Sequence, residues 1–244
     1  MANDLSRPSF YALASGGWRD YVTILHPPYT AWHLSFVVIG AALTPAFSLS
    51  RLLPTLAAFF LAVGVGAHAL DELQGRPLKT GIPDAVLITL AATSLVLAVG
   101  IGAAGAAFVD PWIAAFVIGG SFVVVAYSLE LFAGRFHTDY WFALCWGSFP
   151  VLTGFFAAAG TVSLAALFGT VFAFALSLAQ RHLSTRVRDV RRHVADVTGT
   201  VTRHDGLVEP IKASDLIKPD ELALRALTCS TVALAAALFA MRVV

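Results

Sequence analysis

Long apolar stretches alternate with short polar breaks along almost the whole chain. The stretches consist mainly of Ala, Leu, Val, Phe and Gly, and few charged residues interrupt them. A helix of about 20 such residues spans the hydrocarbon core of a bilayer, which is about 30 Å thick. No stretch alternates polar and apolar residues as the strands of a membrane barrel do. The pattern predicts an all-α integral membrane protein with about seven transmembrane helices, over residues 29–49, 53–73, 83–107, 111–131, 140–160, 162–182 and 222–242.

The basic residues predict how these helices are oriented. With seven spans, the N-terminus and the loops after the second, fourth and sixth helices lie on one side of the membrane. Of the 16 Lys and Arg residues, all except Arg51 and Arg242 fall on that side. Because basic loops stay in the cytoplasm, we expect the N-terminus and these loops to be cytoplasmic and the C-terminus to lie outside. We expect the membrane to be the plasma membrane.

The longest polar stretch, residues 183–221, predicts a small cytoplasmic cap within a single transmembrane domain that covers residues 1–244. It begins as a basic helical continuation of the sixth helix. Its middle, VTGTVTRHDGLVEPI, alternates apolar and polar residues around Asp205 and Gly206, which is typical of a β-hairpin. Such a hairpin cannot face the hydrocarbon, because its outer backbone groups would have no hydrogen-bond partners there.

Composition agrees with a membrane protein and narrows the partners. Charged residues make up 13% of the chain, whereas a soluble domain carries roughly 25%. The net charge of +1 gives no sign of an acidic partner such as a nucleic acid. Cys145 and Cys229 lie inside apolar runs and have no metal-binding spacing, so both are interpreted as small buried side chains.

The end of the second predicted helix is the most informative segment. His68, Asp71 and Glu72 stand at positions i, i+3 and i+4, so they share one helical face. Carboxylates at membrane depth are costly unless they face a polar cavity, a metal or a charged partner. The alternative is a plain interfacial helix end, in which Asp71 or Glu72 pairs with Arg76 or Lys79.

Two further clusters stand at the ends of the fourth and sixth predicted helices. Glu130 lies among apolar residues three positions after Tyr127, and the alternative to a functional role is a pair with Arg135. The sixth helix ends in a basic run that suits a diphosphate, because arginine forks match phosphate oxygens; the alternative is a face that binds lipid headgroups. All three helices end on the same side, so we expect one shared site. The candidates in the basic run are His182, Arg186, Arg188 and Asp189.

Taken together, these motifs resemble the UbiA superfamily of intramembrane prenyltransferases. The similarity starts with His26 and Pro27 ahead of the helix SFVVIGAAL, and includes the polar motif after His68 and Tyr127-Ser followed by a charged residue. The segment GSFPVLTGFFAAAG and the charged end of the sixth helix complete it. The resemblance implies a helical bundle around a cavity, in which magnesium ions bridge a prenyl diphosphate. Ionisation of that diphosphate leads to prenyl transfer or to terpene cyclisation.

The resemblance also implies roles for individual residues. Only Asp71 occupies a position of the family's first aspartate motif, while His68 and Gly75 replace other aspartates; Asp189 is the one acid left at the second motif. The expected catalytic residues are Asp71, Glu72, Tyr127 and Glu130, and the expected Mg²⁺ ligands are His68, Asp71, Glu72 and Asp189. The expected substrate-binding residues are Arg76, Lys79, Arg135, His182, Arg186 and Arg188.

Two other functions remain open from the sequence. A membrane metalloenzyme on the same scaffold would hold a transition metal such as iron, zinc or manganese, which imidazole and carboxylate groups suit. A non-catalytic lipid-binding or transport protein would keep the cavity without the ionisation chemistry. The transition-metal ligands would be His68, Glu72, Glu130 and His182.

Overall fold

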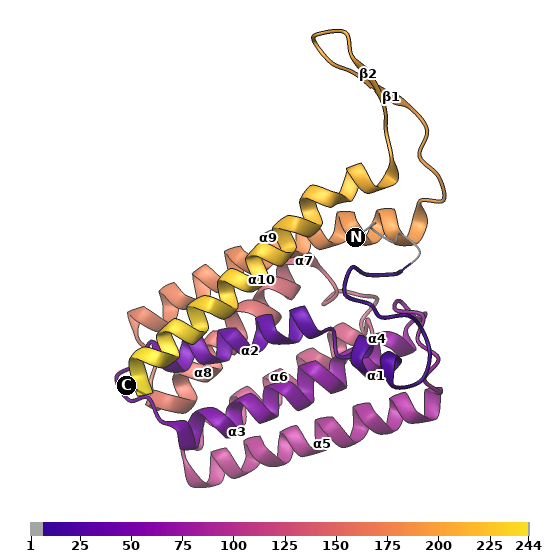
Figure 1. Cartoon of the computed structure of the whole chain (residues 1–244). Coiled ribbons are helices and arrows are strands. Elements are labelled where there is room, and N and C mark those ends of the chain that lie inside the picture. Colours follow the sequence, from indigo (N-terminus) through magenta and orange to yellow (C-terminus); the bar gives the residue numbers. More distant parts are fainter. Residues whose placement is uncertain (1–6, 244) are drawn as a thin grey trace.

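The computed structural model describes residues 7–243, which form eight continuous helices and one small hairpin (Figure 1). Each of the seven predicted apolar stretches is a helix, and a short helix α1 (Trp18–Ile24) precedes them. Five of these helices are long and apolar enough to cross a membrane. The five are Leu49–Leu73, α5 (Asp84–Phe108), Asp139–Ala159, α9 (Leu164–His193) and α10 (Ala213–Val243). The other two, α2 (Pro27–Ala42) and α6 (Ile113–Ser128), have 16 residues each and are shorter than predicted.

Helix α2 lies at the centre of the bundle. Trp32, Phe36 and Ile39 on α2 form a buried cluster with residues of α8, α9 and α10. The approach of α2 to α8 (Phe149–Ala159) is especially close, because Gly40 and Gly154 have no side chains. A Cβ atom at Gly154 would collide with the backbone of Val37. Small residues at such positions let membrane helices pack backbone to backbone, and this contact fixes the second half of α2 against α8.

Two of the long helices contain a π-helical segment. The first consists of α3 (Leu49–Phe59), η1 (Phe60–Ala67) and α4 (His68–Leu73), and the second of α7 (Asp139–Ala143), η2 (Leu144–Ser148) and α8. A π segment changes the rotation of everything that follows it, and such segments are frequent at functional sites. Consequently, the direction in which α4 presents its side chains does not follow from the α-helical pattern of the preceding span.

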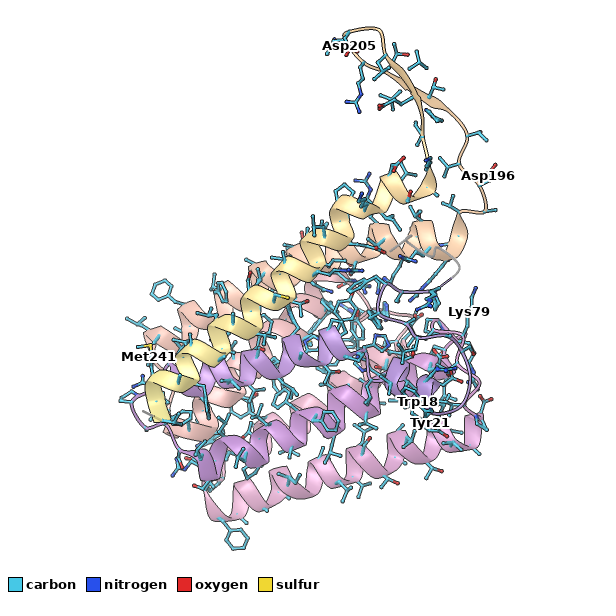
Figure 2. All side chains as sticks on the ribbon, in the orientation of Figure 1. Trp18, Tyr21, Lys79, Asp196, Asp205 and Met241 are labelled. Carbon is cyan, nitrogen blue, oxygen red and sulfur yellow. The ribbon has the colours of Figure 1, made fainter. Side chains whose placement is uncertain are left out.

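The predicted hairpin is present between α9 and α10. Strand β1 (Thr200–Thr202) pairs antiparallel with β2 (Val208–Pro210), and the ion pair between Arg203 and Glu209 joins them. The hairpin projects beyond the ends of α9 and α10, with Asp205 at its tip (Figures 1 and 2). Most of its residues are exposed. Helices α9 and α10 also extend into residues 183–221, so less of this stretch is loop than the sequence predicts.

Candidate functional site

A polar pocket of about 270 Å³ lies where α2, α4, α6 and α9 meet. The three helix ends that the sequence predicts to share a site, those of α4, α6 and α9, all contribute to it. Asp71 comes from α4, Tyr127 from α6 and Arg188 from α9. Other lining residues, none of them among the predicted site residues, come from the start of α2 and from the N-terminal segment; they include Pro8, Ser9, Phe10, Tyr11, His26, Tyr29 and His33.

Three arginines on one face of α9 give the pocket a basic wall. Arg181, Arg188 and Arg192 follow helical spacing and all line the pocket. Arg181 is neutralised by Asp139, with 2.9 Å between its Nε and the carboxylate Oδ1. Arg188 donates to the hydroxyl of Thr185, and within residues 7–243 neither Arg188 nor Arg192 has an acidic side chain within ion-pair distance. Two arginines without a counter-ion suit an anionic ligand.

Polar atoms without partners are also concentrated in this pocket. Tyr127, Ser128 and Gln180 are each at least 97% buried. The Tyr127 hydroxyl, the Ser128 hydroxyl and the Gln180 Oε1 nevertheless have no hydrogen-bond partner in the described part of the chain. Buried polar groups are normally paired, and an unpaired one costs about 1–3 kcal/mol. Their grouping around one cavity indicates that a polar ligand group belongs there.

Imidazole and phenol groups form a second wall of the pocket. The His26 Nδ1 lies 2.7 Å from the hydroxyl of Tyr11, and the ring of His26 stacks on that of His68. Burial lowers the pKa of His26 well below its ordinary value, and His68 and the arginines lower it further. Burial likewise raises the pKa of Tyr11. This wall is therefore neutral, and the positive charge comes from α9.

The N-terminal segment closes the pocket where the sequence predicts the hairpin to act as a cap. Tyr11 bonds to His26, and the backbone N–H of Leu13 donates to the hydroxyl of Thr23. Phe10 packs on Val187 and its neighbours between α9 and α10. Among the residues that line the pocket none comes from the hairpin. Nothing in the sequence of this segment, apart from its two adjacent aromatic residues, signals that role.

Glu72 does not face the pocket. Its carboxylate is fully buried and accepts hydrogen bonds from the backbone N–H groups of Leu78 and Thr80 and from the Thr80 hydroxyl, at 2.8–2.9 Å. Glu72 therefore stabilises the turn between α4 and α5. Although it neighbours Asp71 in sequence, the helical rotation of about 100° per residue sends the two carboxylates in different directions. The expected catalytic and metal-binding role of Glu72 is not supported.

The other predicted residues divide between the pocket and the outside of the molecule. His68, Asp71, Tyr127 and Arg188 line the pocket, and Glu130 lies at its rim, 58% exposed, with His137 as its neighbour instead of Arg135. Arg76 ties the α4–α5 turn by bonding the carbonyls of Thr80 and Ile82 and by pairing with Asp84. Lys79 points outward (Figure 2). The structure does not bring the remaining candidates to the pocket either, because they are exposed: Arg135, His182, Arg186 and Asp189.

Neither predicted set of metal ligands is assembled. Across residues 7–243, no three His, Cys, Asp or Glu side chains are grouped closely enough to hold a metal ion. The Glu72 oxygens already accept three hydrogen bonds. Asp189 pairs with His193, and His182 bonds to its own helix at the Leu178 carbonyl. The residues present therefore fit neither the magnesium site nor the transition-metal site that the sequence suggests.

An apolar groove of about 420 Å³ adjoins the polar pocket. It runs between α3, η1, α5, α6 and α8, and aromatic rings such as Phe116 and Phe149 line it. At one end it reaches Arg51 and Phe108, at the start of α3 and the end of α5. At the other end, Val63 and Trp146 line both the groove and the polar pocket. The two cavities together match an amphiphile with a polar head and an apolar tail.

Comparison of this chain with protein-family models, with curated proteins and with solved structures finds no match.

Proposed function

We propose that this chain is an intramembrane enzyme that acts on a prenyl diphosphate, by prenyl transfer or by cyclisation. The observation that supports this most is the junction at Val63 and Trp146, where a basic polar pocket meets an apolar groove. The diphosphate head would occupy the pocket, and the isoprenoid tail would occupy the groove. The carbon that joins the two parts would then lie beside Trp146.

The head would be held by α9 and by the unpaired polar atoms. Arg188 and Arg192 supply planar forks that match phosphate oxygens. The hydroxyls of Tyr127 and Ser128 can each donate a neutral hydrogen bond to a phosphate oxygen, which would satisfy two of the atoms that lack partners. A bound diphosphate would therefore balance the excess positive charge and give the two unpaired hydroxyls a partner.

The reaction would consist of breaking the bond between the first prenyl carbon and the diphosphate oxygen, whose electron pair leaves with the diphosphate. The arginines stabilise the negative charge that develops on the leaving group. The face of an aromatic ring stabilises the positive charge left on the allyl group, and Trp146 and Tyr127, whose ring centroids are 5.3 Å apart, stand at this place. Because the predicted metal ligands are not assembled, no step is assigned to a metal.

The test uses the full-length protein in liposomes with labelled geranyl, farnesyl and geranylgeranyl diphosphates. We expect diphosphate release from at least one of them, and we expect Arg188→Gln or Arg192→Gln to reduce it by at least about 10-fold, the effect of losing roughly one charge-assisted bond. Arg203→Gln, on the exposed hairpin, is the matched control and should leave it unchanged. Absence of release from all three diphosphates contradicts the proposed activity.

A non-catalytic lipid-phosphate binding protein is the second candidate. It is favoured by the scarcity of acids in the pocket, where Asp71 lines the interior and Glu130 lies at the exposed rim. This candidate predicts saturable binding of the same diphosphates, weakened by Arg188→Gln, without any release of diphosphate. Measuring binding and release on the same samples separates the two functions.

A further inference from the structure

His33 is held in a single tautomer. This residue of α2 is 4% exposed, and its Nδ1 lies 2.8 Å from the backbone carbonyl of Trp146. A carbonyl oxygen can only accept, so Nδ1 carries the proton and donates it. In a neutral imidazole the other nitrogen, Nε2, then holds a lone pair. His33 makes no other hydrogen bond with the described residues, so this lone pair is available.

The position of His33 matters as much as its tautomer. His33 lines the polar pocket, and its bonding partner Trp146 lines both the pocket and the apolar groove. The His33 ring centroid lies 6.3 Å from those of Trp146 and of Phe142. Trp146 belongs to η2, the π-helical segment that brings its carbonyl to α2. His33 therefore stands at the junction where the proposed function places the reacting carbon.

We infer that His33 is the catalytic base that accepts the proton released by the reaction. The inference rests on the proposed function and adds that the second reactant, or the cyclising chain itself, must lose a proton at this point. His33 is not among the site residues that the sequence pattern predicts.

The proton balance holds for both reaction types. In transfer, the acceptor's hydroxyl oxygen or ring carbon forms the new bond to the first prenyl carbon, and its proton moves to Nε2 of His33. In cyclisation, a carbon next to the cationic centre gives its proton to Nε2, and the C–H electron pair becomes a double bond. In either case the resulting imidazolium donates from Nδ1 to the Trp146 carbonyl, which stabilises its charge.

Other titratable groups face the same pocket and enter the test. They are His26 before α2, Tyr29 on α2, His68 and Asp71 on α4, Tyr127 on α6, Glu130 and His137 after α6, Arg181, Arg188 and Arg192 on α9, and Tyr11 of the N-terminal segment. Asp71 is the rival base, because its carboxylate lies inside the pocket. A variant of Asp71 is therefore compared directly with variants of His33.

The main variant is His33→Asn, whose amide can still donate to the Trp146 carbonyl but lacks the basic lone pair. On the same labelled diphosphate, we expect this variant to form product at least about 100-fold more slowly than the wild-type protein does. This factor is the lower bound for a lost general base. Diphosphate release should fall less, and the water-trapped prenyl alcohol should accumulate. The matched control is His204→Asn, on the exposed hairpin, which should change neither quantity.

Chemical rescue separates a base from a packing residue. In His33→Ala, added imidazole should restore product formation, whereas pyrazole, which has a similar size but is a much weaker base, should not. The inference is overturned if imidazole and pyrazole rescue His33→Ala equally. It is also overturned if His33→Asn has the same product, rate and pH profile as the wild type. Both outcomes leave the proposed function in place. If Asp71→Asn loses product formation and His33→Asn does not, the inference is overturned as well. No diphosphate release from the wild type removes both.

Discussion

The imidazole rings of His26 and His68 lie stacked, with their centroids 4.1 Å apart and their planes 18° from parallel. His26 adopts a left-handed backbone conformation, φ 46°, immediately before Pro27. Such a conformation is unfavourable for a residue with a Cβ atom and is retained where the surroundings impose it. Here the surroundings are the stack on His68 and the bond to Tyr11, so the conformation of the chain before α2 depends on a neutral imidazole.

Acid should therefore destabilise the protein through His26. The folded chain holds the pKa of His26 well below the ordinary value of about 6.5. Between these two values the unfolded chain binds more protons, so the stability contributed by neutral His26 is present above pH 6.5 and is lost as the pH falls through this window. We expect the Tm to drop on going from pH 7.5 to pH 5. His26→Gln should show a smaller drop, and His204→Gln the same drop as the wild type.

Glu72 should matter for stability and Asp71 should not. Glu72→Gln replaces an acceptor of three hydrogen bonds by a group that presents an N–H to the N–H of Leu78 or Thr80. We expect a loss of about 2–4 kcal/mol in unfolding free energy, because buried donors lose a charged acceptor. Asp71→Asn, next in sequence but facing the pocket, is the control. Chemical denaturation of both variants in detergent measures the difference, and equal stability of the two would contradict the role assigned to Glu72.

The close approach of α2 and α8 predicts that Gly154 tolerates no side chain. Gly154→Ala would drive a methyl group into the backbone of Val37, which cannot rotate away. We expect a loss of about 1–3 kcal/mol or more, the range for overpacking. Gly119→Ala, on α6 with open space around it, should cost nothing measurable. Thermal unfolding of the two variants decides the point; a stable Gly154→Ala protein would show that the contact is loose.

The topology remains a prediction from the basic residues, with the N-terminus inside and the C-terminus outside. A single cysteine at Arg203, introduced with Cys229→Ser to remove the exposed native thiol, tests it in intact cells. We expect membrane-impermeant reagents to label this cysteine only after the cells are opened. Labelling in intact cells would place the hairpin outside and reverse the predicted orientation.

The sequence by itself determined which apolar segments are helical, although α2, α6, α9 and α10 end at other residues than predicted. Every predicted apolar stretch is a helix, and the predicted hairpin forms around Asp205 and Gly206. This information is local: it depends on the length of apolar runs and on turn residues. The gathering of the ends of α4, α6 and α9 also followed from the sequence, because successive membrane helices must alternate in direction.

Only the tertiary structure decided which side chains share the pocket. Asp71 and Glu72 are neighbours of the same type, yet one faces the cavity and the other stabilises a turn, and the π-helix before them hides that difference from any α-helical pattern. Tyr11, His26 and His33 reach the pocket through contacts between distant segments, such as the bond from His33 to the carbonyl of Trp146. A backbone carbonyl carries no signature in the sequence, and its position depends on how the helices pack.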